Sequence, residues 1–194
     1  MTFRSLRGLA MAALAFLGSF GCAAAPPPNA SSDVLAPRDL YPLVIGNAWS
    51  YEVDTGDATT TLAITRVQSA DGDNVEVRTG SSTIRYEVRA EGIRVPAEDV
   101  WLLRVPLRIG ATWSARGGRT ATLVSLDAVA DTPAGAFRHC AEVLEQGGEL
   151  DLEVRTTYCP GVGPVVVTST MRSDVSERSL TVTAQLRGYE VSPR

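Results

Sequence analysis

Residues 180–187 read LTVTAQLR, and apolar and polar side chains alternate along this stretch without a break. In an extended strand successive side chains point to opposite faces, so the apolar side chains share one face and the polar ones share the other. Residues 49–54 and 84–89 follow the same period. This period is typical of antiparallel strands that have one face buried and the other in water.

Segments of the same character follow one another along most of the chain after residue 41. We expect further strands over residues 59–68, 74–79, 92–95, 100–105, 119–130, 137–144, 152–159 and 164–171. Glycine pairs and Asp-Gly or Glu-Gly steps separate them, as is typical of hairpin turns. The sequence therefore predicts one all-β domain over residues 41–194. Its dozen or so antiparallel strands would form a strongly curved sheet, an open barrel or a sandwich.

A nine-residue motif occurs twice within this domain. Residues 42–50 read PLVIGNAWS and residues 106–114 read PLRIGATWS, so six of nine positions are identical at a spacing of 64 residues. Each copy predicts an extended arm, a glycine turn and a strand that begins by burying its tryptophan. We expect Trp49 and Trp113 to be matching core residues in two related halves of a sheet. The alternative is that the two tryptophans stack on a ligand.

The N-terminus has the layout of a secretory signal peptide. Arg4 and Arg7 precede an apolar run over residues 9–17, and residues 18–22 read GSFGC. The Gly-Cys step resembles a bacterial lipoprotein signal, in which the signal peptidase cuts before the cysteine and the thiol carries diacylglycerol. We therefore predict a signal peptide over residues 1–21 and lipidation of Cys22.

Two residues depart from the usual lipoprotein pattern. Ser19 stands where Leu is common, and Phe20 is bulkier than the small residue expected there. The competing interpretation is ordinary cleavage within residues 22–25, although Pro26 would obstruct a cut after Ala25.

Residues 22–40 predict a disordered tether that begins with the lipidated cysteine. The segment is rich in Ala and Pro and shows no apolar periodicity. Ala23 follows the cysteine where an Asp-type retention signal would stand, which by analogy with enteric bacteria favours the outer membrane. We expect an exported cell-envelope protein that is attached to the membrane by its N-terminal lipid anchor.

The composition excludes several kinds of chemistry. The 18 basic residues are all Arg, and the chain has one His and three Cys. A P-loop and a Schiff-base enzyme both need Lys, and a zinc site built on several histidines cannot be assembled. Without the signal peptide the chain carries a net charge of −6 and no basic run, so we expect no nucleic-acid partner. We predict no cofactor.

The remaining candidate sites favour structural interpretations. Residues 71–74, DGDN, lack the Gly and Glu spacing of an EF-hand and predict a hairpin turn, so we predict no metal site. Glu98 and Asp99 could in principle serve a glycosidase, but such pairs are common on loops. His139 shares its parity with apolar residues of its strand, so we expect an inward-facing structural histidine. We assign no catalytic residue.

The cysteines predict one disulfide. Lipidation of Cys22 leaves Cys140 and Cys159 as a pair in an oxidising compartment. Facing residues of two antiparallel strands have numbers that add to a constant, and the apolar faces of residues 137–143 and 152–158 require an odd constant. The numbers 140 and 159 add to 299, so both sulfurs can meet on the outward face. A two-residue turn at residues 147–148 would give 295, so the disulfide requires a wider loop, roughly residues 146–153, or a bulge. Two free thiols are the alternative.

Several motifs together resemble a family of bacterial, often myxobacterial, envelope lipoproteins, sometimes called TapB-like or assigned to a domain of unknown function. They are YPL and GNAWSY within residues 41–51, PAGAF at residues 133–137 with Cys140, and YCPGVG at residues 158–163. The resemblance implies a secreted, β-rich, lipid-anchored domain. It carries no established catalytic residues.

Three functions remain open. The first is a non-enzymatic, lipid-anchored envelope protein that displays a β-domain for protein or surface interactions. The second is a carrier that encloses a lipid or another apolar ligand in a curved sheet, and the third is a hydrolase that uses His139. We rank the interaction protein first, because the predicted strand faces carry few large apolar residues beyond what a core consumes.

Overall fold

The protein is described here by a computed structural model that covers residues 35–56, 59–148, 151–172 and 179–192. These residues form twelve strands, one short α-helix and two 3-10 turns. Their bounds are α1 Pro37–Leu40, β1 Ala48–Asp54, β2 Thr60–Asp71, β3 Asn74–Thr79, β4 Ser82–Arg89, β5 Gly92–Val95, η1 Pro96–Glu98, β6 Val100–Arg104, β7 Thr112–Ser114, η2 Arg116–Gly118, β8 Arg119–Thr132, β9 Gly135–Gly147, β10 Leu152–Cys159, β11 Gly163–Arg172 and β12 Ser179–Glu190. Within the described ranges, no helix is both long and apolar enough to span a bilayer.

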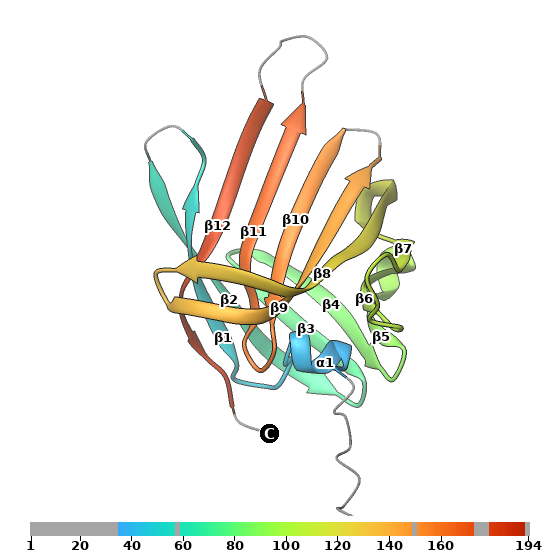
Figure 1. The fold of residues 1–194 in the computed structure, drawn as a ribbon. Coiled ribbons are helices and arrows are strands. Elements are labelled where there is room, and N and C mark those ends of the chain that lie inside the picture. The colour runs from blue at the N-terminus through green and yellow to red at the C-terminus, as the bar shows by residue number, and fades with distance from the viewer. Residues whose placement is uncertain (1–34, 57–58, 149–150, 173–178, 193–194) are drawn as a thin grey trace, which may run out of the picture. The chain divides into compact units, whose positions relative to one another are not determined.

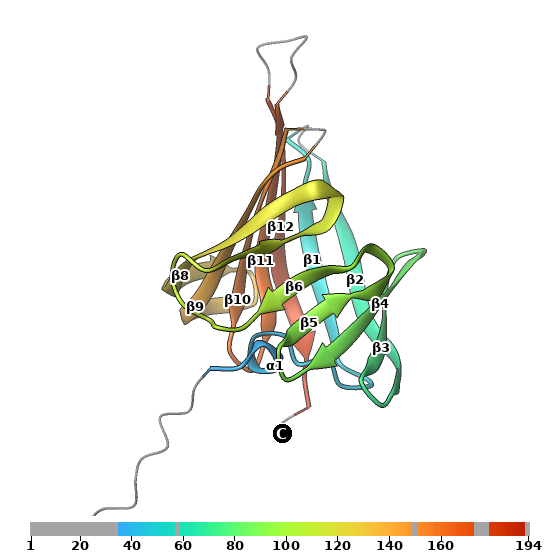
Figure 2. The same ribbon diagram turned by 90° about the vertical axis from the view of Figure 1, so that its right-hand side faces the viewer.

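All twelve strands belong to one antiparallel sheet with the order β6-β5-β4-β3-β2-β1-β12-β11-β10-β9-β8-β7. The sheet consists of two six-stranded meanders, β1–β6 and β7–β12, which the ladder between β1 and β12 joins. It curves until its two end strands, β6 and β7, come close together, so its shape is that of a nearly closed barrel (Figures 1 and 2). The predicted all-β, strongly curved sheet is confirmed, as a barrel and not a sandwich.

The two copies of the nine-residue motif open the two meanders and fold alike. In the first copy, the Gly46 N–H donates to the Val67 carbonyl and the Val67 N–H donates to the Asn47 carbonyl. In the second copy, Gly110 and Ala111 make the equivalent pair of bonds with Leu123 of β8. Gly46 and Gly110 have φ of 90° and 84°, a conformation that glycine adopts at no steric cost. The predicted relationship between two halves of the sheet is confirmed.

The domain begins earlier than the sequence predicts. Residues 35–40 were expected to belong to the disordered tether, but α1 occupies part of this segment and Leu40 is fully buried in the core. Leu35 also packs against the core. The prediction of a tether up to residue 40 is therefore wrong at its C-terminal end. The rest of the predicted tether and the signal peptide, residues 1–34, lie outside the described residues.

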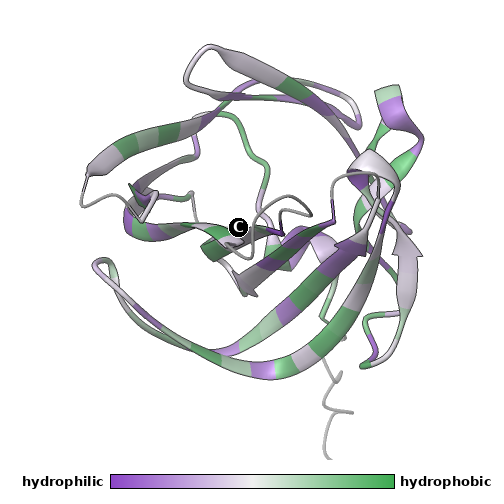
Figure 3. Cartoon of the chain, turned by 90° about the horizontal axis from the view of Figure 1, so that it is seen from above, coloured by the Kyte–Doolittle hydropathy of each residue, from purple (hydrophilic) through white to green (hydrophobic). Residues whose placement is uncertain are grey.

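Alternation along the strands places one side-chain set inside the barrel. Figure 3 shows hydrophobic and hydrophilic residues following one another along the strands. On β1, for example, Trp49 and Tyr51 are buried while Asp54 at the strand end is exposed. The strand patterns that the sequence predicts thus determine which face becomes the core.

The hairpin of β8 and β9 bends sharply over the sheet. Its ladder shifts register three times, between Leu123 and Ala130, and such bulges bend the strand that carries them. The far half of the hairpin consequently crosses β10, β11 and β12 (Figures 1 and 2). The N–H of Ala134, near its tip, donates to the Leu186 carbonyl of β12 over 3.0 Å.

Candidate functional site

The interior of the barrel near α1 is filled by aromatic side chains. The ring centroid of Tyr41 lies 5.3 Å from that of Trp49, 6.2 Å from that of Tyr86 and 6.4 Å from that of Tyr158. Tyr51 is buried beside them and donates its phenol O–H to the Pro164 carbonyl over 2.9 Å. Burial raises the pKa of all four phenols, so they stay protonated. This part of the interior is a packed core.

A buried ion pair lies next to this aromatic cluster. The Arg119 guanidinium donates to one carboxylate oxygen of Glu145, from Nε over 3.1 Å and from Nη2 over 3.0 Å. Burial, followed by the nearby Glu145 charge, raises the pKa of Tyr158. Glu145 therefore lies close to the phenols, although it belongs to the long strand β9. Glu145 thus places a negative charge inside the barrel, and Arg119 of β8 supplies the hydrogen-bond donors for it.

Trp49 and Trp113 are both buried, which confirms the prediction that they are core residues. They differ in their hydrogen bonding. The Trp49 indole N–H donates to the Val162 carbonyl over 2.7 Å, so the loop between β10 and β11 closes over this ring. Within the described part of the chain, the buried indole N–H of Trp113 has no acceptor. The tryptophan of the first copy is thus hydrogen-bonded to another part of the chain, whereas the tryptophan of the second copy has no such bond among the described residues.

The predicted disulfide between Cys140 and Cys159 is present, with a Cα–Cα distance of 4.3 Å. Strands β9 and β10 pair in the predicted register, in which facing residue numbers add to 299. The predicted wider loop is confirmed as well, because β9 ends at Gly147 and β10 begins at Leu152. Both cysteines alternate with Ala141 and Tyr158 and so lie on the opposite face of the sheet, and both are buried there.

Removing the disulfide should destabilise the domain. The bond closes a loop with a sequence separation of 19, so the variant Cys140→Ala/Cys159→Ala should lose on the order of 3 kcal/mol of unfolding free energy. Urea unfolding followed by circular dichroism measures this loss. Cys22→Ala leaves the bond intact and serves as the matched control. Cys140 and Cys159 peptides that alkylate freely without prior reduction would show that the bond is absent.

His139 does not occupy the predicted inward-facing position. Its side chain is about four-fifths exposed, and its backbone has a φ of 55° at an irregular part of the β8–β9 ladder. The bulges change which residue numbers point inward on this strand, and the prediction assumed an unbroken alternation. Its Nδ1 lies 2.7 Å from an Asp127 carboxylate oxygen, so an Asp-His pair exists, on an exposed hairpin. A hydrolase would also need a nucleophile beside the other ring nitrogen, and the hydrogen bonds of the described residues bring none there.

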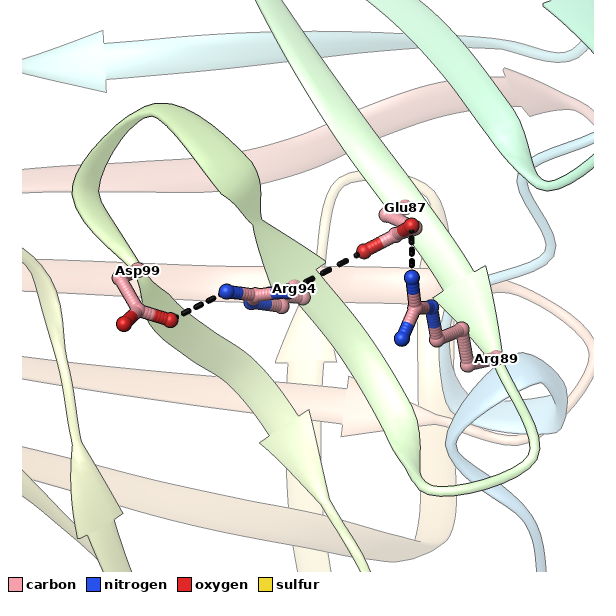
Figure 4. A network of polar contacts seen from close by, with 4 residues as sticks. All are labelled: Glu87, Arg89, Arg94 and Asp99. Atoms are coloured by element: carbon pink, nitrogen blue, oxygen red, sulfur yellow. Dashed lines mark hydrogen bonds and ion pairs between the residues drawn. The ribbon is translucent and has the colours of Figure 1, made fainter.

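Glu98 and Asp99 are each engaged by a different arginine. Asp99 accepts a hydrogen bond from Arg94, which raises the pKa of the guanidinium, and Arg94 also lies 3.5 Å from Glu87 (Figure 4). Arg89 completes this surface network at 2.5 Å from Glu87. Glu98 instead pairs with Arg116 over 2.7 Å. Asp99 is therefore tied to β5 and Glu98 to η2, so the two neighbouring carboxylates are held by separate ion pairs.

The acidic turn at residues 71–74 is a hairpin turn between β2 and β3, as predicted, with Asp71 facing Asn74. Among the described residues, His, Cys, Asp and Glu side chains do not gather in groups of three or more that could hold a metal ion. Cys22 lies outside the described residues.

Sequence reasoning missed a groove on the outer face of β2 and β3. It has a volume of about 400 Å³ and is lined by Leu62, Ile64, Arg66, Gln68, Arg78 and Gly80. The signal was present in the sequence, because the large apolar residues Leu62 and Ile64 stand on the opposite parity to the core residue Val67.

A second apolar surface lies on the inner face of the strands that extend beyond the aromatic core. The ladders bring Leu152, Met171 and Leu180 side by side, with Met171 and Leu180 exposed. Val154 and Val182 occupy the next row of the same face and are only partly buried. This end of the sheet therefore keeps an apolar inner wall that the described residues do not fully cover.

No family model and no curated protein matches the chain. The resemblance to the TapB-like lipoproteins therefore stays a prediction. One solved structure is similar, a candidate exported protein with a YmcC-like fold from Bacteroides fragilis NCTC 9343. It is 14% identical, and the match covers 76% of this chain and 96% of that one, with a TM-score of 0.46.

Proposed function

We infer that the protein is a non-enzymatic, lipid-anchored envelope protein whose barrel presents its surfaces to other molecules. The observation that carries this proposal is the packed interior near α1, where Tyr41, Tyr51, Tyr86, Tyr158 and Trp49 occupy the space that a small-molecule site would need. The exposed faces of the sheet are then the surfaces available for binding. The N-terminal sequence supports export and anchoring, because Cys22 directly follows the apolar run of the signal peptide.

Replacing Cys22 with Ala tests the anchor. Several acyl chains on one cysteine hold a protein on a membrane almost permanently, because each buried methylene contributes about 0.8 kcal/mol. The Cys22→Ala protein should therefore leave the detergent phase in Triton X-114 partitioning and accumulate as a precursor or a soluble form. Cys140→Ala/Cys159→Ala is the control and should still partition into detergent. A Cys22→Ala protein that partitions like the unchanged protein would refute the anchor.

A carrier of apolar ligands is the second candidate, and one observation favours it. The inner wall with Leu152, Met171 and Leu180 is apolar and is only partly covered by the described residues, as a wall that contacts an acyl chain would be. Native mass spectrometry after mild purification separates the two functions. A co-purifying lipid bound in a fixed ratio to the domain would favour the carrier.

A further inference from the structure

The outer face of β2 combines exposed apolar and basic side chains. Leu62, Ile64 and Arg66 stand at alternate positions and so point to the same side of the sheet. Leu62 is 64% exposed and Ile64 is 57% exposed, which is high for large apolar side chains in the middle of a strand. Together with Arg78 on β3 they line the groove described above, here called the β2–β3 groove. Its apolar and cationic groups are therefore within one continuous surface.

Two like charges face each other across this groove. Arg66 and Arg78 are direct partners in the β2–β3 ladder, and like charges in this arrangement repel. The six lining residues include no carboxylate, and none of the ion pairs between described residues involves Arg66. The neighbouring β3–β4 ladder shows the usual arrangement, because Glu76 of β3 there faces Arg85 of β4, with which it forms an ion pair over 3.0 Å. The groove is thus locally cationic on a chain whose net charge is negative.

An anion bound between Arg66 and Arg78 would attract both guanidinium groups and so offset their mutual repulsion. Guanidinium groups bind phosphate through paired, charge-assisted hydrogen bonds, and Leu62 and Ile64 offer apolar contacts directly beside them. A phospholipid surface has both features in this order, with anionic phosphates above an apolar layer. Surface binding of this kind gains from buried apolar area and from attraction to anionic lipids together. We propose that the β2–β3 groove docks the barrel on the surface of a membrane that contains anionic phospholipids.

This inference rests on the proposed lipid anchor, and the chain length between anchor and domain allows it. Residues 23–34 separate Cys22 from the first described residue, and an extended chain spans at most about 3.5 Å per residue. The Cα of Cys22 is thus at most about 45 Å of chain from the first described residue. A short tether keeps the barrel near the membrane, and the groove would fix which face it turns toward the lipid.

Vesicle flotation of the Cys22→Ala chain without the predicted signal peptide, residues 22–194, tests docking without the anchor and without the apolar run of residues 9–17. The probes are vesicles of phosphatidylcholine alone and vesicles in which phosphatidylglycerol replaces part of it. We expect the Cys22→Ala chain to bind better to the anionic vesicles, and added salt should weaken this binding. Exchanging both groove arginines, as Arg66→Gln/Arg78→Gln, should weaken it further by about thirtyfold, because each Arg near an anionic surface contributes about fivefold. Leu62→Ser/Ile64→Ser should also weaken it.

The control removes two exposed arginines elsewhere, as Arg108→Gln/Arg138→Gln, and should bind like the parent chain. Loss of the repulsion should leave the melting temperature of Arg66→Gln/Arg78→Gln equal to that of the parent or above it, so weaker binding would not reflect unfolding. Equal binding of the parent and the groove variant would overturn the proposal, and so would an equal loss in the control. Neither result would touch the anchor, which the detergent partitioning of the Cys22 protein tests separately.

Discussion

Replacing Trp49 with Ala is expected to lower the free energy of unfolding by about 3–5 kcal/mol, the usual cost of removing a fully buried tryptophan. The ring is 1% exposed and packs edge-on against Tyr41. It also ties down the β10–β11 loop through the hydrogen bond to the Val162 carbonyl. A Cβ on Gly163 would lie 3.1 Å from the indole nitrogen, so the loop fits closely over the ring. The substitution therefore leaves both a cavity and an unpaired carbonyl.

The repeated motif supplies a matched control for this prediction. Trp49→Phe keeps most of the apolar volume but loses the hydrogen bond to Val162, which should cost about 1 kcal/mol. Trp113→Phe removes a buried N–H that has no acceptor among the described residues, so this variant should not lose the stability of a hydrogen bond. Chemical unfolding of the unchanged protein, Trp49→Ala, Trp49→Phe and Trp113→Phe gives the comparison. A Trp49→Ala protein with unchanged unfolding but impaired binding would instead place Trp49 in a binding site.

Replacing Arg119 with Met should cost a similar amount, about 3–5 kcal/mol, because it leaves the Glu145 carboxylate buried without its partner. Both side chains are largely shielded from water, with relative exposures of 15% and 11%. Met matches the Arg side chain as far as Nε and so keeps the packing of its stem, and the loss comes mainly from the guanidinium group, its charge and its hydrogen bonds. The unfolding free energy from urea titration measures the effect.

The double variant Arg119→Met/Glu145→Leu is the informative control. Replacing both members of a buried ion pair with apolar residues of similar size is often neutral, so most of the lost stability should return. Arg85→Met breaks a pair of similar length on the open surface, between Arg85 and Glu76, and should cost less than about 1 kcal/mol. If Arg119→Met is no more destabilising than Arg85→Met, then the Arg119–Glu145 pair does not stabilise the barrel.

Local patterns were sufficient to predict much of the fold. The strands over residues 74–79, 92–95 and 152–159 begin and end where the alternation and the turn residues place them. The register of β9 against β10 also followed from parity and from the two cysteines, because a shift by one residue would reverse every side chain on the strand. Alternation sets which face of a strand is buried. It does not say whether the sheet closes, which is why barrel and sandwich remained open.

The features that the sequence could not show depend on contacts between distant segments. The bend of the β8–β9 hairpin depends on bulges between Leu123 and Ala130, and these moved His139 from the expected inner face to the surface. Leu40 resembles a linker residue until the barrel provides the core that buries it. The β2–β3 groove needs Arg66 and Arg78 to face each other, and only the ladder register establishes this.

The sheet order also bears on how fast the protein reaches its native state. Every ladder except one joins strands that follow each other in the chain, so each six-stranded half can form by local pairing. The exception pairs Ala48 with Glu190, and bringing such distant residues together carries a large loop-closure entropy. Folding rates fall as such non-local contacts increase, so closure between β1 and β12 should be the slow step. Until then β1 and β12 both present open edges, and two chains folding side by side could exchange halves through them.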